Sequence, residues 1–235
     1  MLYADTADLE QLEEMLDMGI FTGITTNPSI MEKANVVNYE DHIKQICKMS
    51  PGTVSVELTG SVKDVDGLIA EAQLLHSYDP SKIVIKVPMW PDGTGVGLGK
   101  YLESHKIRVN MTCLMSVNQA MLGCLADSTY VSLFYNRMID YYGQKGKKGK
   151  ENLVVGRNAA NLHMRHARNM IDRFGWKSKI IAGSIRHHED VTLCLLHGAD
   201  IVTVPFDRYR ELFSHPKTIE TIKQFDDAWK RIKRD

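Results

Sequence analysis

The 235-residue sequence predicts an α/β protein: a single TIM (β/α)8 barrel spanning residues 1–235, with an extra C-terminal helix. Three observations carry this prediction. Eight short apolar runs recur along the chain, longer segments of helical period separate them, and no Pro/Gly/Ser-rich linker divides the chain. Buried parallel strands read as continuous apolar runs, and eight of them separated by helices are typical of this barrel. A doubly wound open sheet uses the same βα units and is the alternative.

The expected elements follow one another in regular alternation. Candidate strands are short runs rich in β-branched residues, and candidate helices carry apolar residues three or four positions apart. The strands are Leu2–Asp5, Gly23–Thr25, Val54–Leu58, Ile83–Val87, Arg108–Thr112, Tyr130–Phe134, Lys179–Ser184 and Ile201–Val204. The helices are Leu9–Met18, Tyr39–Met49, Val62–Ser77, Gly97–His105, Val117–Ala126, Asn158–Phe174, His188–His197 and the C-terminal Ile219–Ile232.

Composition excludes several classes of function. The 29 basic and 29 acidic residues leave no net charge, so nothing global attracts nucleic acid or an anionic membrane. The N-terminus lacks a signal-peptide pattern, and no apolar run approaches the roughly 20 residues that span a bilayer, so we expect a cytoplasmic protein. Cys47, Cys113, Cys124 and Cys194 lie far apart without CxxC spacing, which predicts reduced core thiols and no metal site.

Polar residues stand at the ends of the predicted strands. In a TIM barrel these ends meet at one mouth, where active sites lie. Each residue has an ordinary structural explanation, such as a helix N-cap, a turn or a surface side chain, but their joint placement favours a site. The residues are Asp5, Thr25, Thr26, Asn27, Glu57, Lys86, Asn110, Thr112, Ser132, Phe134, Arg137, Ser184 and Arg186.

Lys86 is the most informative of these residues, because the run KIVIKVP places an ammonium group inside an apolar strand. Burial disfavours the charged form of a lysine and makes a neutral amine available near neutral pH. Such an amine can attack a carbonyl, and the resulting Schiff base accepts electrons when a carbon–carbon bond breaks. The sequence therefore predicts an imine-forming lysine.

Charged neighbours fit this chemistry. Glu57 and Asp5 are candidates for acid and base catalysis, because carboxylates can relay protons directly or through one water. Arg137 and Arg186 suit a planar oxyanion such as phosphate, which guanidinium groups bind in bidentate fashion. The Gly/Lys-rich stretch 144–152 is expected to be a solvated loop more often than a ligand clamp.

Seven segments together resemble the transaldolase family, including its small microbial members and the related fructose-6-phosphate aldolases. They are GITTNPSI (23–30), SVEL (55–58), VIKVP (84–88), VNMT (109–112), YVSLFYNR (130–137), GSIR (183–186) and GADIVTVPF (198–206), in order along nearly the whole chain. The resemblance implies a class I aldolase without metal or cofactor. It also implies transfer of a dihydroxyacetone unit from a ketose phosphate to an aldose phosphate, as in the pentose phosphate pathway, and a homo-oligomer built from pentamers, often a decamer.

The resemblance assigns a role to each matched position. Lys86 corresponds to the Schiff-base lysine, Asp5 to the base at the C4 hydroxyl, and Glu57 to the acid/base acting through a water. Thr112 corresponds to the threonine that orients this water. Asn27, Asn110 and Ser132 correspond to residues that hold the dihydroxyacetone hydroxyls, and Arg137, Ser184 and Arg186 to the phosphate site; Thr26 belongs to the TTNPS signature.

Two positions favour transaldolase over free aldolase. Where the similar aldolases carry a glutamine and a tyrosine, this chain has Glu57 and Phe134. A phenyl ring supplies no hydroxyl to protonate the carbanionic intermediate, so we expect that intermediate to wait for an acceptor aldehyde. A free dihydroxyacetone aldolase remains the alternative, and a non-catalytic sugar-phosphate-binding barrel is less favoured because it needs no nucleophile.

Departures from the family pattern flank the anion site. Leu133 replaces a proline, the pair Tyr135-Asn136 replaces a small residue, and the loop over roughly Tyr141–Asn158 is longer and more basic. These changes leave the substrate's far end open, so a sulfonated or otherwise modified sugar is conceivable. The sequence also leaves open whether the C-terminal segment, with Phe225 and Trp229 on one face, packs on its own barrel or on a neighbour's.

Overall fold

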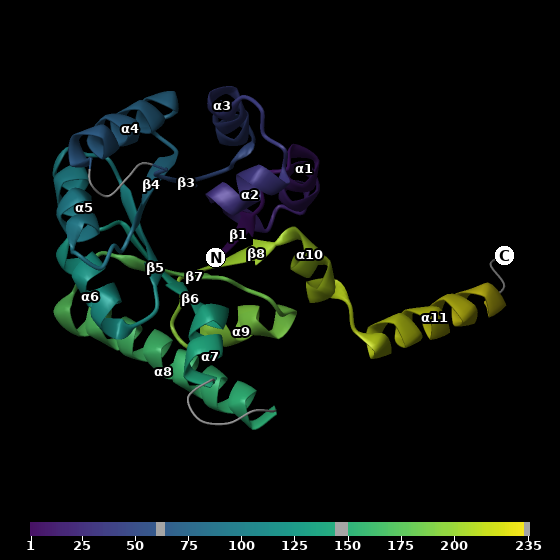
Figure 1. The fold of residues 1–235 in the computed structure, drawn as a ribbon. Helices are drawn as coiled ribbons and strands as arrows, with labels where there is room; N and C mark the ends of the chain where they lie inside the picture. Colours follow the sequence, from purple (N-terminus) through teal and green to yellow (C-terminus); the bar gives the residue numbers. More distant parts are fainter. Residues whose placement is uncertain (60–63, 144–149, 233–235) are drawn as a thin grey trace.

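The computed structural model describes residues 1–59, 64–143 and 150–232, and it contains a closed barrel of eight parallel strands (Figure 1). Neighbours in sequence pair throughout, and β8 pairs with β1 to close the barrel. The strands are β1 (Leu2–Asp5), β2 (Phe21–Thr25), β3 (Val54–Glu57), β4 (Ile83–Pro88), β5 (Val109–Leu114), β6 (Tyr130–Phe134), β7 (Lys179–Gly183) and β8 (Ile201–Pro205). The predicted fold class is confirmed, and the open-sheet alternative is wrong.

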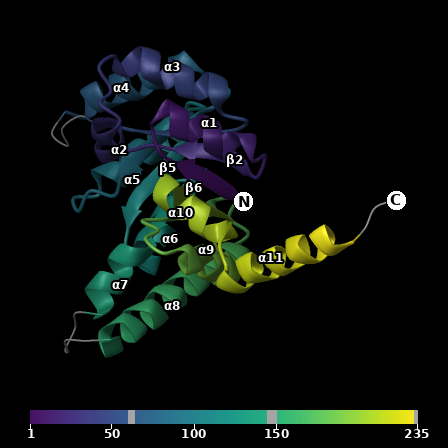
Figure 2. The ribbon, with the colours of Figure 1, turned by 90° about the vertical axis from the view of Figure 1, so that its right-hand side faces the viewer.

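Helices surround the barrel, as two views at right angles show (Figures 1 and 2). They are α1 (Leu9–Asp17), α2 (Pro28–Lys33), α3 (Tyr39–Met49), α4 (Val65–Tyr78), α5 (Thr94–Ser104), α6 (Val117–Leu125), α7 (Tyr135–Gly143), α8 (Lys150–Phe174), α9 (His188–Leu196) and α10 (Phe206–Tyr209). A 3-10 turn at Arg210–Phe213 and a C-terminal helix, α11 (Pro216–Arg231), follow them. The sequence did not predict α2, α7 or α10. The predicted helix start at 62–63 lies outside the described residues.

Side chains alternate along each strand between the barrel interior and the surrounding helices, as a period of two requires. On β4, Ile83, Ile85 and Val87 belong to the large apolar cluster shared with the helices. Val84 belongs instead to a small inner cluster, with Tyr3, Tyr130, Ile181 and Ile201. Lys86 comes two residues after Val84, so it lies on the inward face of the same strand.

A polar contact closes the N-terminal end of the barrel interior. The hydroxyl of Tyr3 lies 2.8 Å from Thr53 Oγ1 and 3.3 Å from the hydroxyl of Tyr130. The two rings meet edge to face, with centroids 6.5 Å apart. Burial raises the pKa of Tyr3 well above its usual value, so the phenol of Tyr3 stays neutral inside the barrel.

Helices α7 and α8 form a hairpin beside the mouth (Figure 2). The predicted loop over Tyr141–Asn158 is therefore wrong for residues 141–143 and 150–158, which are helical, while 144–149 lie outside the described residues. Gly156 makes the close approach of these helices possible, because a Cβ there would lie 2.2 Å from the carbonyl oxygen of Ile139. Glycine often indicates a loop in a sequence, but Gly156 lies within helix α8 and allows it to pack closely on α7.

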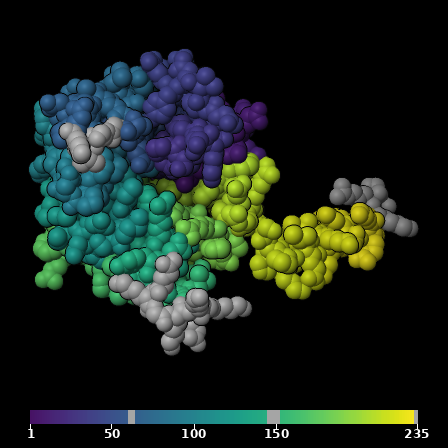
Figure 3. All heavy atoms as spheres, viewed as in Figure 1, coloured from purple at the N-terminus to yellow at the C-terminus, as the bar shows by residue number. Residues whose placement is uncertain are grey.

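The C-terminal helix α11 stands away from the barrel (Figures 1 and 3). None of its described residues is buried, and its apolar side chains Phe225 and Trp229 are 62% and 57% exposed. The helix predicted at Ile219–Ile232 is thus present but does not pack on its own barrel. No helix among the described residues is long and apolar enough to cross a membrane.

Candidate active site

Two adjoining cavities lie at the C-terminal ends of the strands. The smaller, about 120 Å³, is lined by Asp5, Thr25, Asn27, Lys86, Asn110, Ser132, Phe134, Arg137, Ile181, Gly183, Ser184 and Thr203. The larger, about 580 Å³, also reaches Asp5, Asn27, Phe134 and Arg137, and it extends to Glu57, Cys113, α2 and the start of α10. The four shared residues make the two cavities one mouth, which contains most of the predicted site residues.

Lys86 lies inside the barrel near the end of β4 and is only 5% exposed. Its ammonium group donates a hydrogen bond to the carbonyl oxygen of Thr26 at 2.9 Å and lies 3.1 Å from Glu57 Oε2. Glu57 is the register partner of Lys86 on the neighbouring strand β3, which explains why the two groups meet. A buried lysine amine is thus held beside a carboxylate and faces the smaller cavity.

Asp5 is the second carboxylate of the mouth and lines both cavities. Its Oδ1 accepts a hydrogen bond of 2.7 Å from the hydroxyl of Thr25 on β2. Burial raises the pKa of Asp5 above the ordinary carboxyl value, and the hydrogen bond from Thr25 and the positive charge of Lys86 oppose this rise. A carboxylate kept at such a cost is typical of a functional site.

The raised pKa of Asp5 predicts that Asp5→Asn increases the free energy of unfolding at neutral pH. A carboxyl group whose pKa is higher in the folded than in the unfolded state destabilises the fold once both states are ionised. The asparagine carbonyl still accepts the Thr25 hydrogen bond, and Glu57 still pairs with Lys86. Urea unfolding of both proteins across pH should show the gain at pH 7 and its loss toward acid pH. A less stable variant at pH 7 would contradict this reading.

A chain of hydrogen bonds runs through the barrel interior beside Lys86, whose register partner on β5 is Asn110. Ser132 donates to Asn110 Oδ1 at 2.7 Å, and Asn110 Nδ2 donates to Ser55 Oγ at 3.2 Å. All three residues are buried, and two of them, Asn110 and Ser132, line the smaller cavity. Their hydroxyl and amide groups can form hydrogen bonds with the hydroxyls of a small polar ligand.

Thr112 and Thr26 are buried beside the mouth, although neither lines a cavity among the described residues. The hydroxyl of Thr112 has no hydrogen-bond partner in the described part of the chain, so it is available to a water molecule. Thr26 donates its hydroxyl to the carbonyl oxygen of Ser55 at 2.9 Å, while its own carbonyl receives Lys86. The position of Thr26 indicates that it orients the lysine.

Asn27 lines both cavities and also begins helix α2. Its side-chain oxygen accepts a hydrogen bond from the Ile30 amide at 3.0 Å, and Pro28 occupies the first helical position. An N-cap asparagine followed by proline is a recognised start signal for a helix. Its amide nitrogen remains able to donate toward the mouth.

The predicted anion-site residues are only partly brought together. Arg137 lines both cavities, with its guanidinium 5.4 Å from the centre of the Phe134 ring, and Ser184 lines the smaller cavity. Arg186 is about half exposed, pairs with Asp140 of α7 at 2.8 Å, and is not among the described residues that line either cavity. Arg137 is therefore the better-placed cation in this conformation.

Several mouth residues were not singled out from the sequence. Gln11 and Lys33 line the larger cavity, and Ser55 extends the interior hydrogen-bond chain. Ser55 could have been found, because it lies two residues before Glu57 on the inward face of β3. Gln11 and Lys33 carry no comparable signal in the sequence, because their place depends on how α1 and α2 pack.

The four cysteines are free thiols, three of them buried and Cys113 partly so. No group of three or more His, Cys, Asp or Glu side chains among the described residues is placed to hold a metal ion. The ionisable groups at the centre of the mouth are thus Lys86, Asp5 and Glu57, with Arg137 at its edge.

Comparison with known proteins agrees with this architecture. Residues 2–235 match the family described as Transaldolase/Fructose-6-phosphate aldolase. A probable transaldolase of Geobacillus kaustophilus (strain HTA426) is 37% identical over 98% of this chain and 99% of the relative. A probable transaldolase of Petrotoga mobilis (strain DSM 10674 / SJ95) is 34% identical over 98% and 95%, respectively.

A solved structure, inosine 5' monophosphate dehydrogenase from Legionella pneumophila, shares the fold alone. It superposes with a TM-score of 0.55 at 12% identity, covering 87% of this chain and 57% of that one. The family match and the relatives, by contrast, extend over nearly the whole sequence and include the strands that build the mouth. The chain belongs to the transaldolase/fructose-6-phosphate aldolase family.

Proposed function

We propose that the protein is a transaldolase that transfers a dihydroxyacetone unit from a ketose phosphate to an aldose phosphate through a Schiff base on Lys86. The observation that carries the proposal is the setting of Lys86. Its buried amine faces a cavity, lies 3.1 Å from Glu57 and is electrostatically coupled to Asp5. A buried lysine beside two carboxylates has the groups that imine formation and aldol cleavage require.

In this mechanism Glu57 takes a proton from Lys86, and the free amine attacks the C2 carbonyl of the ketose phosphate. Loss of water from the carbinolamine gives the iminium ion. Asp5 then removes the proton of the C4 hydroxyl, the C3–C4 bond breaks, and its electrons move into the iminium to form an enamine. The aldose phosphate leaves, and an acceptor aldehyde reverses these steps to form the new ketose.

Water must leave during imine formation and return during hydrolysis. The hydroxyl of Thr112, buried without a partner among the described side chains, supports a role in holding that water. Glu57 would exchange protons with it, because one carboxylate can serve as acid in one step and base in the next. The hydroxyls of the dihydroxyacetone unit would contact Asn27, Asn110 and Ser132, which line the same cavity as Lys86.

Arg137, Ser184 and Arg186 are proposed to bind the terminal oxyanion of the sugar, with unequal contributions. Arg137→Ala is expected to weaken the binding of a phosphorylated ketose by about 2 kcal/mol. This is the low end of the cost of losing one partner of a buried charge pair, because Arg137 is exposed in the free protein. Arg186→Ala should cost less, since Arg186 must first leave Asp140. Saturation of imine trapping by fructose 6-phosphate and by dihydroxyacetone measures both effects.

A larger loss from Arg186→Ala than from Arg137→Ala would mean that the Arg186–Asp140 pair opens readily around substrate. Equal losses for the phosphorylated and the uncharged substrate would instead show that both arginines act on folding.

The experiment that tests the proposed function is a donor–acceptor panel with phosphorylated and sulfonated sugars, in which free dihydroxyacetone is monitored beside the transfer product. Transfer without release identifies a transaldolase, whereas release as the main reaction identifies a free aldolase. Borohydride added with a ketose phosphate separates both from a binding protein, because only an imine is reduced to a stable adduct. Failure to form any adduct would overturn the proposal.

The exposed face of α11 supports a second proposal, that the protein is a homo-oligomer. Ile219, Ile222, Phe225 and Trp229 recur at helical spacing, and all are more than half exposed. A helix with an uncovered apolar stripe gains stability mainly by packing on another surface. A second copy of the chain would supply that surface, and the ring assemblies common in this family, pentamers or decamers, are the proposed form.

Trp229→Glu is expected to shift the protein toward smaller species, because it places a charge in the apolar stripe of α11. Sedimentation velocity measures the distribution. Gln224→Glu is a matched control, since it adds the same charge on the opposite side of the same helix, where Gln224 contacts Glu220. An unaltered distribution in Trp229→Glu would mean that α11 does not form the contact between copies.

A further inference from the structure

A buried polar network joins the two segments that carry the proposed anion site, the first turn of α7 and the loop between β7 and α9. Asn136, at the start of α7, donates from Nδ2 to Asp190 Oδ2 on α9 at 2.7 Å. Asp190 is fully buried and Asn136 almost so. Asn136 directly precedes Arg137, so the hydrogen bond holds the first turn of the helix from which that arginine projects.

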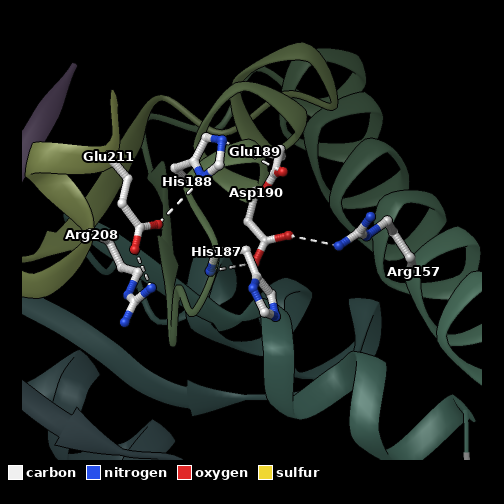
Figure 4. A network of polar contacts seen from close by, with 7 residues as sticks. All are labelled: Arg157, His187, His188, Glu189, Asp190, Arg208 and Glu211. Atoms are coloured by element: carbon white, nitrogen blue, oxygen red, sulfur yellow. Dashed lines mark hydrogen bonds and ion pairs between the residues drawn. The ribbon is translucent and has the colours of Figure 1, made fainter. Parts of the chain in front are cut away.

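Asp190 also holds the other segment, the loop that follows β7. Its Oδ2 accepts the backbone N–H of His187 at 3.2 Å, and its Oδ1 lies 3.3 Å from Arg157 Nη2 on α8 (Figure 4). A fully buried carboxylate requires hydrogen bonds and a counter-charge, and these three donors provide them. Because His187 is adjacent to Arg186, the same carboxylate restrains both arginine-bearing segments.

Ser184 gives independent evidence that this loop is constrained. It has a φ of +60°, a left-handed conformation that is uncommon for residues other than glycine. The N–H of Asn136 donates to the carbonyl oxygen of Ser184 at 3.3 Å. Backbone strain of this kind persists only where the surroundings enforce it, and here Asn136 contacts both Ser184 in the loop and Asp190 on α9. The side chain of Ser184 faces the cavity that contains Lys86.

We propose that Asn136, Asp190 and Arg157 are positioning residues for the substrate's terminal oxyanion. They act through Arg137 and Ser184, whose spacing they set, and they touch neither the sugar carbons nor Lys86. The network therefore determines how strongly the mouth prefers an anionic sugar over an uncharged one. This inference rests on the proposed function of the mouth as an imine-forming site for anionic sugars.

Two variants and one control test the inference. Asn136→Ala removes the link between the loops, and Arg157→Gln removes the counter-charge from a partly exposed position where folding is less at risk. Asp200→Asn is the matched control. Asp200 pairs with Arg168 of the same helix α8 at 3.1 Å and accepts the Ile180 N–H at 2.7 Å, but at the opposite end of the barrel.

The readout is the concentration of fructose 6-phosphate or of dihydroxyacetone that gives half-maximal borohydride inactivation, with inorganic phosphate as a competing anion. Asn136→Ala is expected to raise this concentration for fructose 6-phosphate at least about tenfold, since small displacements of binding groups have effects of this size. Competition by phosphate should weaken in parallel. The value for dihydroxyacetone should stay within about twofold, because the charge-independent part of the site is intact. Arg157→Gln should change the ratio of the two half-maximal concentrations, fructose 6-phosphate over dihydroxyacetone, in the same direction but by less.

The inference is overturned if Asn136→Ala or Arg157→Gln changes the half-maximal concentration equally for both substrates. It is also overturned if Asp200→Asn changes the ratio of the two concentrations as much as these variants do. Either result would leave the network a structural feature. A different result would overturn the proposed function itself: a wild-type protein that forms no adduct with either compound. If the Asn136→Ala variant traps dihydroxyacetone with the same half-maximal concentration as the wild-type protein, the imine chemistry has survived and only the preference for an anionic sugar has changed.

Discussion

Lys86→Ala is expected to abolish imine trapping and to lower turnover by about 10⁴-fold or more, because among the described residues no other lysine lines the smaller cavity. The amine of Lys86 is buried, faces the smaller cavity and lies between Glu57 and the Thr26 carbonyl. The barrel should still fold, since Glu57 lines the larger cavity and is not left buried without a partner. Circular dichroism and mass spectrometry of the reduced adduct measure the two outcomes.

Lys82 offers a matched control for this experiment. It lies four residues earlier, directly before β4, is partly buried, and donates to the carbonyl oxygens of Cys47 and Ser50 at 2.7 and 2.8 Å. Lys82→Ala removes an equally restrained ammonium group outside the mouth, so adduct formation on Lys86 should continue. An adduct mapped to any lysine other than Lys86 would remove the basis of the mechanism.

Phe134→Tyr is expected to divert the reaction from transfer to release of free dihydroxyacetone. After the C3–C4 bond breaks, the enamine on Lys86 is either captured by an aldehyde or protonated. The phenyl ring of Phe134 lines both cavities and offers neither a proton nor a hydrogen bond to a water. A phenol there introduces a general acid, which typically contributes about 10²–10⁴-fold, so the partition should change visibly.

A coupled assay for dihydroxyacetone beside the transfer product measures this partition. Phe206→Tyr is the control: Phe206 lines only the larger of the two cavities and, like Phe134, has an arginine over its ring, with Arg210 at 5.1 Å. It should leave the partition unchanged. The interpretation fails if the wild-type protein already releases dihydroxyacetone as its main product, or if Phe134→Tyr forms the imine with the wild-type partition.

The barrel could be predicted from the sequence because its strands are short apolar runs bounded by helical periodicity. Strands β1 and β6 begin and end where predicted. Helix α2 was missed, although Asn27-Pro28 is an N-cap followed by a favourable first residue, because a six-residue helix looks like a turn. The first part of α8 was missed because Gly156 indicates a loop locally and serves close helix packing in three dimensions.

The centre of the candidate site was predictable for a different reason. Parallel strands bring their carboxyl ends to one mouth, so Asp5, Glu57 and Lys86 had to converge whatever their side-chain conformations. The outer part depends on contacts between distant helices. The pairing of Arg186 with Asp140, and of Asn136 with Asp190, joins segments whose relative placement no local pattern specifies.

The hydrogen-bonded plug of Tyr3, Thr53 and Tyr130 has a kinetic consequence for the proposed transfer. The plug occupies the barrel interior on the side of Lys86 away from the mouth, and the cavity that Lys86 lines lies at the C-terminal ends of the strands. We therefore expect the first aldose to leave through the same mouth by which the acceptor enters. Because the dihydroxyacetone unit would stay on Lys86 between the half-reactions, we expect ping-pong order, with the departing aldose competing directly with the acceptor.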